Sequence, residues 1–343
     1  MPTGDHEQPS VRSGPPRPTL KTIAEMSGLA VATVSRALAD DPKIAEATRK
    51  RVAEIARLIG YEPDRAARRL RTGRTMVINL ILDPHFEVLG FGNALLVGLT
   101  GALEGTGYNL VVTPHFTEED VLPPIRRIVT NRQADGLIFT RTAPFDERVR
   151  FLMEQGFPFV CHGRTEFTEP HPWVDHDNEA FAYAAAGRLV AQGCQRICAL
   201  LPPESLTFRQ HLRYGLMRAV RETGVEFHIP DEVTLDSPMD RIQAWAQAIA
   251  TTPDSPDGFI CGGEASWLAI RNGYRAAGQG ARFRAVAKSI SGILSQIDAG
   301  AEVIHEDIEE AGRLLGDHLL RRIAEPHLPP PQTLQAPVIQ FRD

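Results

Sequence analysis

TLKTIAEMSGLAVATVSRALADDPKIAEATRKRVAEIARLIGYEPDRAARRLRTGR, residues 19–74, contains three short helical patterns in a row. The first two, Leu20–Met26 and Val31–Leu38, are separated by a break in which Gly28 suits the positive φ that a tight turn often needs. A third helix carries apolar residues at helical spacing on one face, at Val52, Ile55, Ala56 and Ile59. Two helices joined by such a turn are typical of helix-turn-helix domains, whose second helix enters the major groove of DNA. The pattern alone also fits a plain three-helix core with solvated charges.

A short basic segment follows this head. Residues 63–74 read as one helix, with Asp64 as the N-cap and Gly73 at its end. A helix this short is unstable alone in water and folds when it lies against an ordered partner. Its Arg side chains suit phosphate or minor-groove contacts, and Leu70 suits an apolar wedge between base steps. We therefore predict a hinge helix at residues 63–74 that folds on DNA.

Residues 19–75 resemble the DNA-binding end of the LacI/GalR (lactose-repressor) family of bacterial transcription regulators. The matching residues are Ile23-Ala24, Ser27-Gly28, Ala32-Thr33-Val34-Ser35-Arg36, Thr48-Arg49, Val52, Gly60-Tyr61, Pro63, Ala67-Arg68 and Leu70. The resemblance implies a sequence-specific regulator, predicted to act as a repressor, that binds double-stranded operator DNA. It also implies that Leu70 enters the minor groove at the operator centre and kinks it.

The same resemblance implies which residues contact DNA. They are Thr22, Val31, Ala32, Thr33, Ser35 and Arg36 in the head, and Arg65, Ala67, Arg68 and Leu70 in the hinge. Two positions depart from the family pattern. Asp64 stands where an Asn is frequent, and Val31 and Ala32 are both small and apolar. We expect these two residues to read bases through methyl contacts instead of bidentate hydrogen bonds.

At 343 residues, the chain is too long for one ordinary core, which suggests two or three domains. We predict a disordered extension at residues 1–18, the head at 19–62, the hinge at 63–74 and a larger domain at 75–343. The extension is rich in Pro, Gly and Ser and lacks the apolar core of a secretory signal. No segment is apolar enough over its length to span a bilayer, and the 4 cysteines, without CxxC spacing, are expected to be buried free thiols. These features favour a cytoplasmic protein.

Charge is divided unequally along the chain. Residues 17–75 carry thirteen Lys/Arg and seven Asp/Glu, whereas the formal net charge of the whole chain is −6 at pH 7. The remainder is therefore strongly acidic. A basic head on an acidic body fits a DNA-binding segment joined to a sensor that DNA repels.

After Thr75, short apolar runs alternate with amphipathic helical stretches. The predicted strands are 76–82, 109–113, 136–139, 159–162, 196–201, 258–261, 284–287 and 301–305, and the predicted helices include 93–106, 121–131, 178–192, 212–223 and 265–276. This alternation predicts a two-lobed α/β body of parallel sheets with helices on both faces. Ligands of such folds bind beyond the carboxyl ends of the strands, which predicts an effector site between the lobes.

The LacI/GalR resemblance continues more weakly through this body, which in that family is similar to periplasmic sugar-binding proteins. Residues 134–139, 174–178, 196–200 and 306–312 follow the family's order. The tail after Glu325 is rich in Pro and has no leucine heptads, which argues against the tetramer helix of the lactose repressor and favours a homodimer. The implied effector is a small molecule, predicted to be a sugar or sugar derivative, with a non-sugar anionic metabolite as the alternative.

The expected effector pocket departs most from the family pattern. Leu212 replaces a usual Arg, Gly262-Gly263-Glu264 replaces an Asn-Asp pair, and a late pocket Asp falls near Lys288-Ser289, whereas Asp177 matches. Cationic side chains nearby suit an anionic ligand, although each is equally well read as a surface charge. We predict effector contacts at Asp83, His85, Phe86, Arg164, Asp177, Arg209, Arg213, Glu264 and Lys288.

Signatures of catalysis and metal binding are missing from the sequence. The histidines lack metal-ligand spacing with Cys or acidic partners, and no GxGxxG, Walker or GxSxG motif occurs. We therefore expect no enzymatic activity, no metal and no cofactor. Two rival classes remain, namely a binding protein without a regulatory role and an enzyme built on an α/β body. They remain because a sequence does not show which side chains lie together in the folded protein. A gel shift with the chain's own upstream DNA would separate a regulator from both.

Overall fold

The computed structural model describes residues 18–61, 73–82, 90–115 and 120–341. The chain divides into two compact units, Met1–Arg74 and Thr75–Asp343. The predicted extension at residues 1–18 and the predicted hinge helix at 63–74 lie almost wholly outside the described residues, so both stay predictions.

Three helices form the described part of the first unit, namely α1 (Leu20–Ser27), α2 (Val31–Leu38) and α3 (Glu46–Leu58). Thr19 and Thr22 begin α1 with a reciprocal cap, in which each hydroxyl accepts a hydrogen bond from the other residue's amide. Gly28 ends α1 at φ 69°, in the left-handed region that glycine adopts at little cost. The buried residues Ile23, Ala24, Val34, Ala37, Val52 and Ala56 join the three helices in one small core. The predicted helices and the turn at Gly28 are confirmed.

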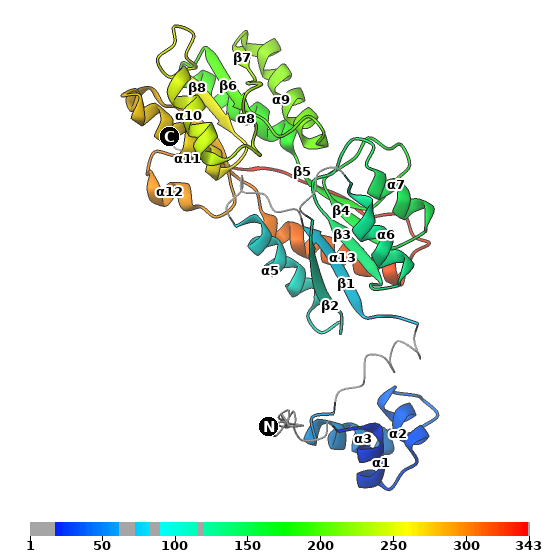
Figure 1. The fold of residues 1–343 in the computed structure, drawn as a ribbon. Coiled ribbons are helices and arrows are strands. Elements are labelled where there is room, and N and C mark those ends of the chain that lie inside the picture. Colours follow the sequence, from blue (N-terminus) through cyan, green and yellow to red (C-terminus); the bar gives the residue numbers. More distant parts are fainter. Residues whose placement is uncertain (1–17, 62–72, 83–89, 116–119, 342–343) are drawn as a thin grey trace, which may run out of the picture. The chain divides into compact units, whose positions relative to one another are not determined.

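The second unit is a body of two lobes, each built on a six-stranded sheet (Figure 1). The lobe that contains β1, called the N-lobe, has a sheet of the order β11-β5-β4-β3-β1-β2. Its strands are β1 (Val77–Leu82), β2 (Asn109–Pro114), β3 (Gly136–Phe139), β4 (Phe159–His162), β5 (Trp173–His176) and β11 (Gln332–Gln335). All of its strands are parallel.

The other lobe, called the C-lobe, has a sheet of the order β12-β10-β9-β8-β6-β7. Its strands are β6 (Arg196–Leu200), β7 (Glu226–His228), β8 (Gly258–Cys261), β9 (Ala285–Ser289), β10 (Glu302–His305) and β12 (Val338–Gln340). Only the edge strand β12 runs antiparallel to its neighbour within this sheet. The expectation of parallel sheets in two lobes is therefore confirmed, with this one exception at an edge.

Helices cover both faces of each sheet. On the N-lobe, α5 (Phe91–Leu103) and α13 (Ile308–Ala324) pack against one face of the sheet, where they meet Ile78 and Leu80 of β1. On the other face, α6 (Leu122–Thr130) and α7 (Glu147–Glu154) pack in a core that includes Ile81 of β1. On the C-lobe, α8 (Asn178–Ala191) and α9 (Thr207–Thr223) cover one face, and α10 (Met239–Ile249) and α11 (Glu264–Ala276) cover the other. A short helix, α12 (Ile293–Ile297), follows β9. Because both faces are covered, the central strands are buried along their length, as expected for parallel sheets.

The chain passes between the lobes three times. It leaves the N-lobe after β5, returns after β10, and leaves again between β11 and β12. The Pro-rich tail is thus not a simple extension, because it adds one edge strand to each sheet. The three crossings bring the carboxyl ends of both sets of strands to the boundary between the lobes, where a ligand site is expected.

Candidate DNA interface and effector pocket

Helix α2 carries five of the side chains that were predicted to contact DNA. Val31, Ala32 and Arg36 are exposed, and Thr33 and Ser35 are partly exposed. Val31 retains 45% of its surface, so its methyl groups are open to a partner. The N-cap residue Ala30 makes no side-chain hydrogen bond to the helix. The first amides of α2 are therefore available to an anion such as a phosphate.

Two other polar side chains of the head, those of Arg49 and Thr22, have structural partners within it. The guanidinium of Arg49 donates to the carbonyls of Asp41 and Ile44 and pairs with Asp40 at 2.8 Å, so it holds the loop between α2 and α3. The side chain of Thr22, a predicted DNA contact, already caps α1. The predicted hinge contacts Arg65, Ala67, Arg68 and Leu70 lie outside the described residues.

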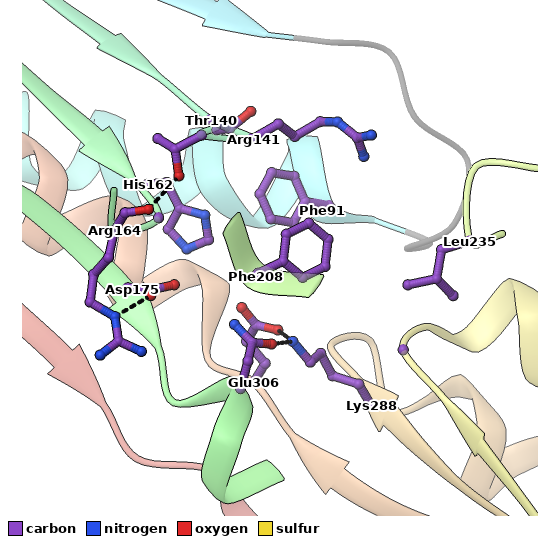
Figure 2. A pocket seen from close by; sticks show the side chains of 14 residues that line it. Phe91, Thr140, Arg141, His162, Arg164, Asp175, Phe208, Leu235, Lys288 and Glu306 are labelled. Atoms are coloured by element: carbon purple, nitrogen blue, oxygen red, sulfur yellow. Dashed lines mark hydrogen bonds and ion pairs between the residues drawn. The ribbon is translucent and has the colours of Figure 1, made fainter. Parts of the chain in front are cut away.

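A cavity of about 660 Å³, part of it open to solvent, lies between the two lobes (Figure 2). Most of the lining residues follow the carboxyl ends of β3, β4, β5, β8 and β9 or lie on the crossing after β10. They are Phe91, Thr140, Arg141, Thr142, His162, Gly163, Arg164, Asp175, Asn178, Phe208, Leu235, Gly262, Lys288 and Glu306.

Aromatic side chains supply apolar surface in this cavity. Phe91 comes from the start of α5 and meets the ring of His162 edge to face at 5.7 Å between centroids. Phe208 comes from the start of α9, and Leu235 lies on the loop before α10. Figure 2 shows the rings of Phe91 and Phe208 on the same side of the Glu306–Lys288 pair. Apolar rings beside polar groups suit a ligand with both an apolar face and hydroxyl groups.

Three ion pairs lie in or beside the cavity wall. Arg141 pairs with Asp236, Arg164 donates to Asp175 at 2.7 Å, and Lys288 pairs with Glu306 at 2.8 Å. In the last two pairs the carboxylates are almost fully buried. Each cation that lines the cavity therefore already has an anionic partner within the protein.

Two buried polar atoms of the cavity wall have no hydrogen-bond partner among the described residues. They are the Thr140 hydroxyl, in a residue only 1% exposed, and Nε2 of His162. Burial lowers the pKa of His162, so its ring is neutral near pH 7. Unpaired buried polar groups are costly, and a ligand that hydrogen-bonds them removes the cost.

Direct contacts also join the lobes around the cavity. The Thr142 carbonyl, on the loop after β3, accepts hydrogen bonds from the amide of Thr207 at 2.9 Å and from its hydroxyl at 3.0 Å. Arg141 of the N-lobe pairs with Asp236 of the C-lobe, and Arg164 lies 3.4 Å from a ring nitrogen of His211. The residues that line the cavity are therefore next to those that tie the lobes together.

The predicted effector residues fall into three groups. Arg164 and Lys288 line the cavity. The side chain of Asp177 instead caps α8, that of Arg209 is buried and donates to the Pro202 carbonyl at 2.6 Å, and Arg213 lies exposed beside Gln210. Glu264 is fully buried and accepts from Ser289, Ile290 and Ser291, so it organises the loop after β9. Asp177, Arg209, Arg213 and Glu264 therefore do not line the cavity. Asp83, His85 and Phe86 lie outside the described residues.

Several lining residues were not predicted, including Phe91, Thr140, His162, Phe208 and Glu306. A usable signal existed for some of them, because Thr140 and His162 stand at or directly after the ends of predicted strands. Phe208 gave no such signal, because the predicted helix at 212–223 begins five residues earlier than expected, at Thr207.

Comparison with known proteins accounts for both units. Residues 19–64 match the description "Bacterial regulatory proteins, lacI family", and residues 89–315 match "Periplasmic binding proteins and sugar binding domain of LacI family". The regulator AglR of Rhizobium meliloti (strain 1021) is 33% identical over 71% of this chain and 68% of its own length. The chain belongs to the LacI family of bacterial regulatory proteins.

Solved structures of this LacI family share the fold. The Lac repressor dimer bound to operator and the anti-inducer ONPF matches with a TM-score of 0.78, at 17% identity over 95% of this chain and 98% of the other. The regulator CelR in complex with cellobiose matches with a TM-score of 0.68, at 21% identity over 95% and 99% of the two chains. The resemblance inferred from residues 19–75 is thus confirmed, and the chain is a DNA-binding transcriptional regulator with a sugar-binding type of effector domain.

Two kinds of feature are absent from the part of the chain that the structure describes. No helix there is long and apolar enough to cross a membrane. No group of three or more His, Cys, Asp or Glu side chains there is arranged to hold a metal ion. The four cysteines are buried and unpaired, and burial raises the pKa of Cys261 to about 12, so its thiol is inert.

Proposed function

We propose that this LacI-family chain is a repressor whose affinity for operator DNA is controlled by a sugar or sugar derivative bound between the lobes. The observation that carries the proposal is the cavity itself, which joins apolar rings to unpaired hydrogen-bonding atoms at the boundary of two lobes. Phe91 and Phe208 suit the apolar face of a sugar ring, and Thr140 and His162 suit its hydroxyls. The complex of the related CelR with cellobiose supports the same ligand class.

A non-sugar anionic metabolite is the alternative effector. It needs a cation that is free to pair with it, but Arg164 and Lys288 are each held by a buried carboxylate. An anion would have to displace Asp175 or Glu306, which would then lie buried and unpaired at a large energetic cost. The sugar is therefore favoured.

Control of DNA binding follows from how the lobes are tied. A ligand shifts an equilibrium between two arrangements only by its difference in affinity for them. A sugar that touches both lobes changes the balance of the contacts at Thr142–Thr207 and Arg141–Asp236, and so favours one angle between the lobes. Such coupling is typically worth about 1–3 kcal/mol, which is roughly a 5–150-fold change in operator affinity.

The proposed active form is a homodimer with two heads on a roughly palindromic operator, whose half-sites lie about one helical turn apart. An apolar patch supports a dimer face on the N-lobe. Val97 of α5 is 46% exposed, and Val112 of the edge strand β2 is 41% exposed. Leu110 lies in the same groove as Val97, and Val112 follows it two residues later on the same side of the strand. A regulator of this kind works in the cytoplasm beside its DNA, and needs neither enzymatic activity nor a cofactor.

A two-part experiment tests the proposal. Thermal unfolding is measured with a panel of neutral mono- and disaccharides and of anionic metabolites, because binding to the native state at 100 times Kd adds about 2.7 kcal/mol of stability. A gel shift with a duplex selected from random DNA is then measured with and without each compound that binds. We expect at least one sugar to bind and to change the gel shift. Binding of anionic metabolites alone, or sugar binding without any effect on DNA affinity, would contradict the proposal.

A further inference from the structure

A buried ion pair lies in the cavity wall where two of the three crossings meet. Lys288 is the last residue but one of β9, Glu306 lies on the crossing after β10, and Asn178 follows the crossing after β5. The ammonium of Lys288 lies 2.8 Å from Oε2 of Glu306 and donates to the side-chain oxygen of Asn178 at 2.6 Å. Both charged side chains are 7% exposed, and both line the cavity (Figure 2).

The ammonium of Lys288 already has partners within the protein. Two of its three donors go to Glu306 and Asn178, and its nitrogen lies 5.3 Å from the centroid of the Phe181 ring. Asn178 is itself fixed, because its amide donates to the His176 carbonyl at 3.1 Å. The ammonium is therefore held in place and its charge is balanced within the protein.

Glu306 differs from its partner in having spare capacity. Its Oε2 faces Lys288, which is the only group that hydrogen-bonds to this carboxylate among the residues that the structure describes, so Oε1 is left for a further donor. Burial would raise the pKa of Glu306, but Lys288 and the nearby His176 and His162 more than offset this and bring the pKa to about 2. The carboxylate is thus ionised near pH 7 and can only accept hydrogen bonds.

Resting on the proposed function, we propose that this Lys288–Glu306 pair makes the effector site selective for neutral sugars over acidic ones. Glu306 presents Oε1 to a sugar hydroxyl, and Lys288 is a positioning residue that holds the carboxylate in place. A uronate or a sugar phosphate in the same place would direct its own oxygens at Glu306 and find no free cation. Like charges at such short range in a buried site repel strongly.

The test compares matched ligands that differ by one charge. The probes are the methyl glycosides of glucose and galactose, and those of glucuronate and galacturonate, in which the primary alcohol is replaced by a carboxylate. Dissociation constants are measured by calorimetry for the wild-type chain and for Glu306→Gln, which keeps the shape of the side chain and leaves Lys288 without its anion. We expect the wild type to prefer the neutral glycoside, and Glu306→Gln to shift that preference toward the uronate by roughly tenfold or more.

Two further variants distinguish an effect of the Lys288–Glu306 pair from an effect of the overall charge of the protein. Lys288→Gln/Glu306→Gln restores a neutral site and is expected to bring the preference back to within about threefold of the wild type, against the shift of roughly tenfold or more in Glu306→Gln. Glu302→Gln removes a carboxylate from another ion pair, Arg188–Glu302 at 2.6 Å, whose residues do not line the cavity, and ought to leave the preference unchanged. A shift in Glu302→Gln equal to that in Glu306→Gln would overturn the proposal, because overall charge would then explain both.

The outcomes also separate this inference from the proposed function. If the wild type binds neutral glycosides and Glu306→Gln keeps the same preference, the selectivity proposed for the Lys288–Glu306 pair is wrong, but the proposal of a sugar effector is unaffected. If the wild type binds no sugar at all, both fail. Should Glu306→Gln not fold, as judged by its thermal unfolding, Lys288→Gln carries the test in the opposite direction, and any gain in uronate binding by that variant contradicts the proposal.

Discussion

Arg36 is the exposed cation of α2, the helix that was predicted to read DNA. It lies on the exposed side of α2, and no ion pair to it occurs among the residues that the structure describes. Arg36→Ala is expected to lower affinity for a selected duplex by about 1–3 kcal/mol, and to reduce the slope of log affinity against log salt by about one if the contact is to a phosphate. Binding titrations at several salt concentrations measure both quantities.

Lys50→Ala serves as the matched control for this loss of charge. Lys50 is also exposed, but it lies on α3 and pairs with Glu46 at 2.8 Å, so its charge is already compensated. We expect it to cost less DNA affinity than Arg36→Ala. Sugar binding ought to be the same in both variants, because the contacts of the effector cavity all lie in the body. Loss of sugar binding in Arg36→Ala would contradict the separation of the two functions.

At the residue level, Arg164 and Lys288 line the cavity as predicted, whereas four other predicted effector residues that the structure describes do not. Lys288 was predicted to contact the effector, with pairing to an anionic ligand as one alternative, and it lines the cavity, but Glu306 already pairs with it. Glu306 lies eighteen positions away and belongs to the next strand unit, so no spacing rule connects the two. Glu264 was predicted to contact the effector and instead holds the loop after β9, because a fully buried carboxylate needs several donors and found them in Ser289, Ile290 and Ser291.

At the level of elements, α5 and α13 pack unusually closely over the N-lobe sheet. A Cβ atom added to Gly312 of α13 would lie 2.4 Å from the Leu95 carbonyl oxygen and 3.0 Å from the Leu99 nitrogen, both in the backbone of α5. Backbone atoms cannot rotate away, so Gly312→Ala has to push the helices apart. We expect it to lower the free energy of unfolding by about 1–3 kcal/mol, measured by denaturant titration.

Gly187→Ala is the matched control for that substitution. Gly187 also lies inside a helix, α8, but a Cβ atom added there would meet nothing within 4 Å. Since alanine is a better helix former than glycine, this variant is expected to gain up to about 1 kcal/mol. Equal losses of stability in the two variants would show that helix packing at Gly312 is not the cause.

The elements with clear periodicity were predicted, and those stabilised mainly by tertiary contacts were not. The fully buried strands, such as 136–139 and 258–261, were predicted with their observed bounds because an uninterrupted apolar run marks them. The start of α9 at Thr207 was missed, because the buried Arg209 on its inner face breaks the apolar pattern and is satisfied by the Pro202 carbonyl. The edge strands β11 and β12 were missed as well, since Gln332–Gln335 and Val338–Gln340 are short and partly or fully exposed.

For the whole molecule, the start of the body is fixed independently of the head. The carboxylate of Asp135, directly before β3, accepts hydrogen bonds from the amide of Thr75 at 2.7 Å, from its hydroxyl at 2.9 Å and from the amide of Met76 at 2.9 Å. A chain that begins at Thr75 therefore keeps the anchor of its first strand. It also keeps the effector cavity and the exposed apolar patch of α5 and β2.

A chain of residues 75–343 is accordingly expected to fold, to form a dimer and to bind the same sugar with a Kd within about threefold of the full chain, the scatter usual for a site left structurally intact. It is expected to lose DNA binding entirely. Light scattering measures the mass, calorimetry the sugar affinity and a gel shift the binding to the selected duplex. Val112→Glu in this shortened chain places a charge in the apolar patch and ought to give a monomer that still binds sugar, because β2 contributes nothing to the cavity lining. A shortened chain that is monomeric without that substitution would assign dimer formation to the head and hinge, and an unfolded one would refute the boundary at Thr75.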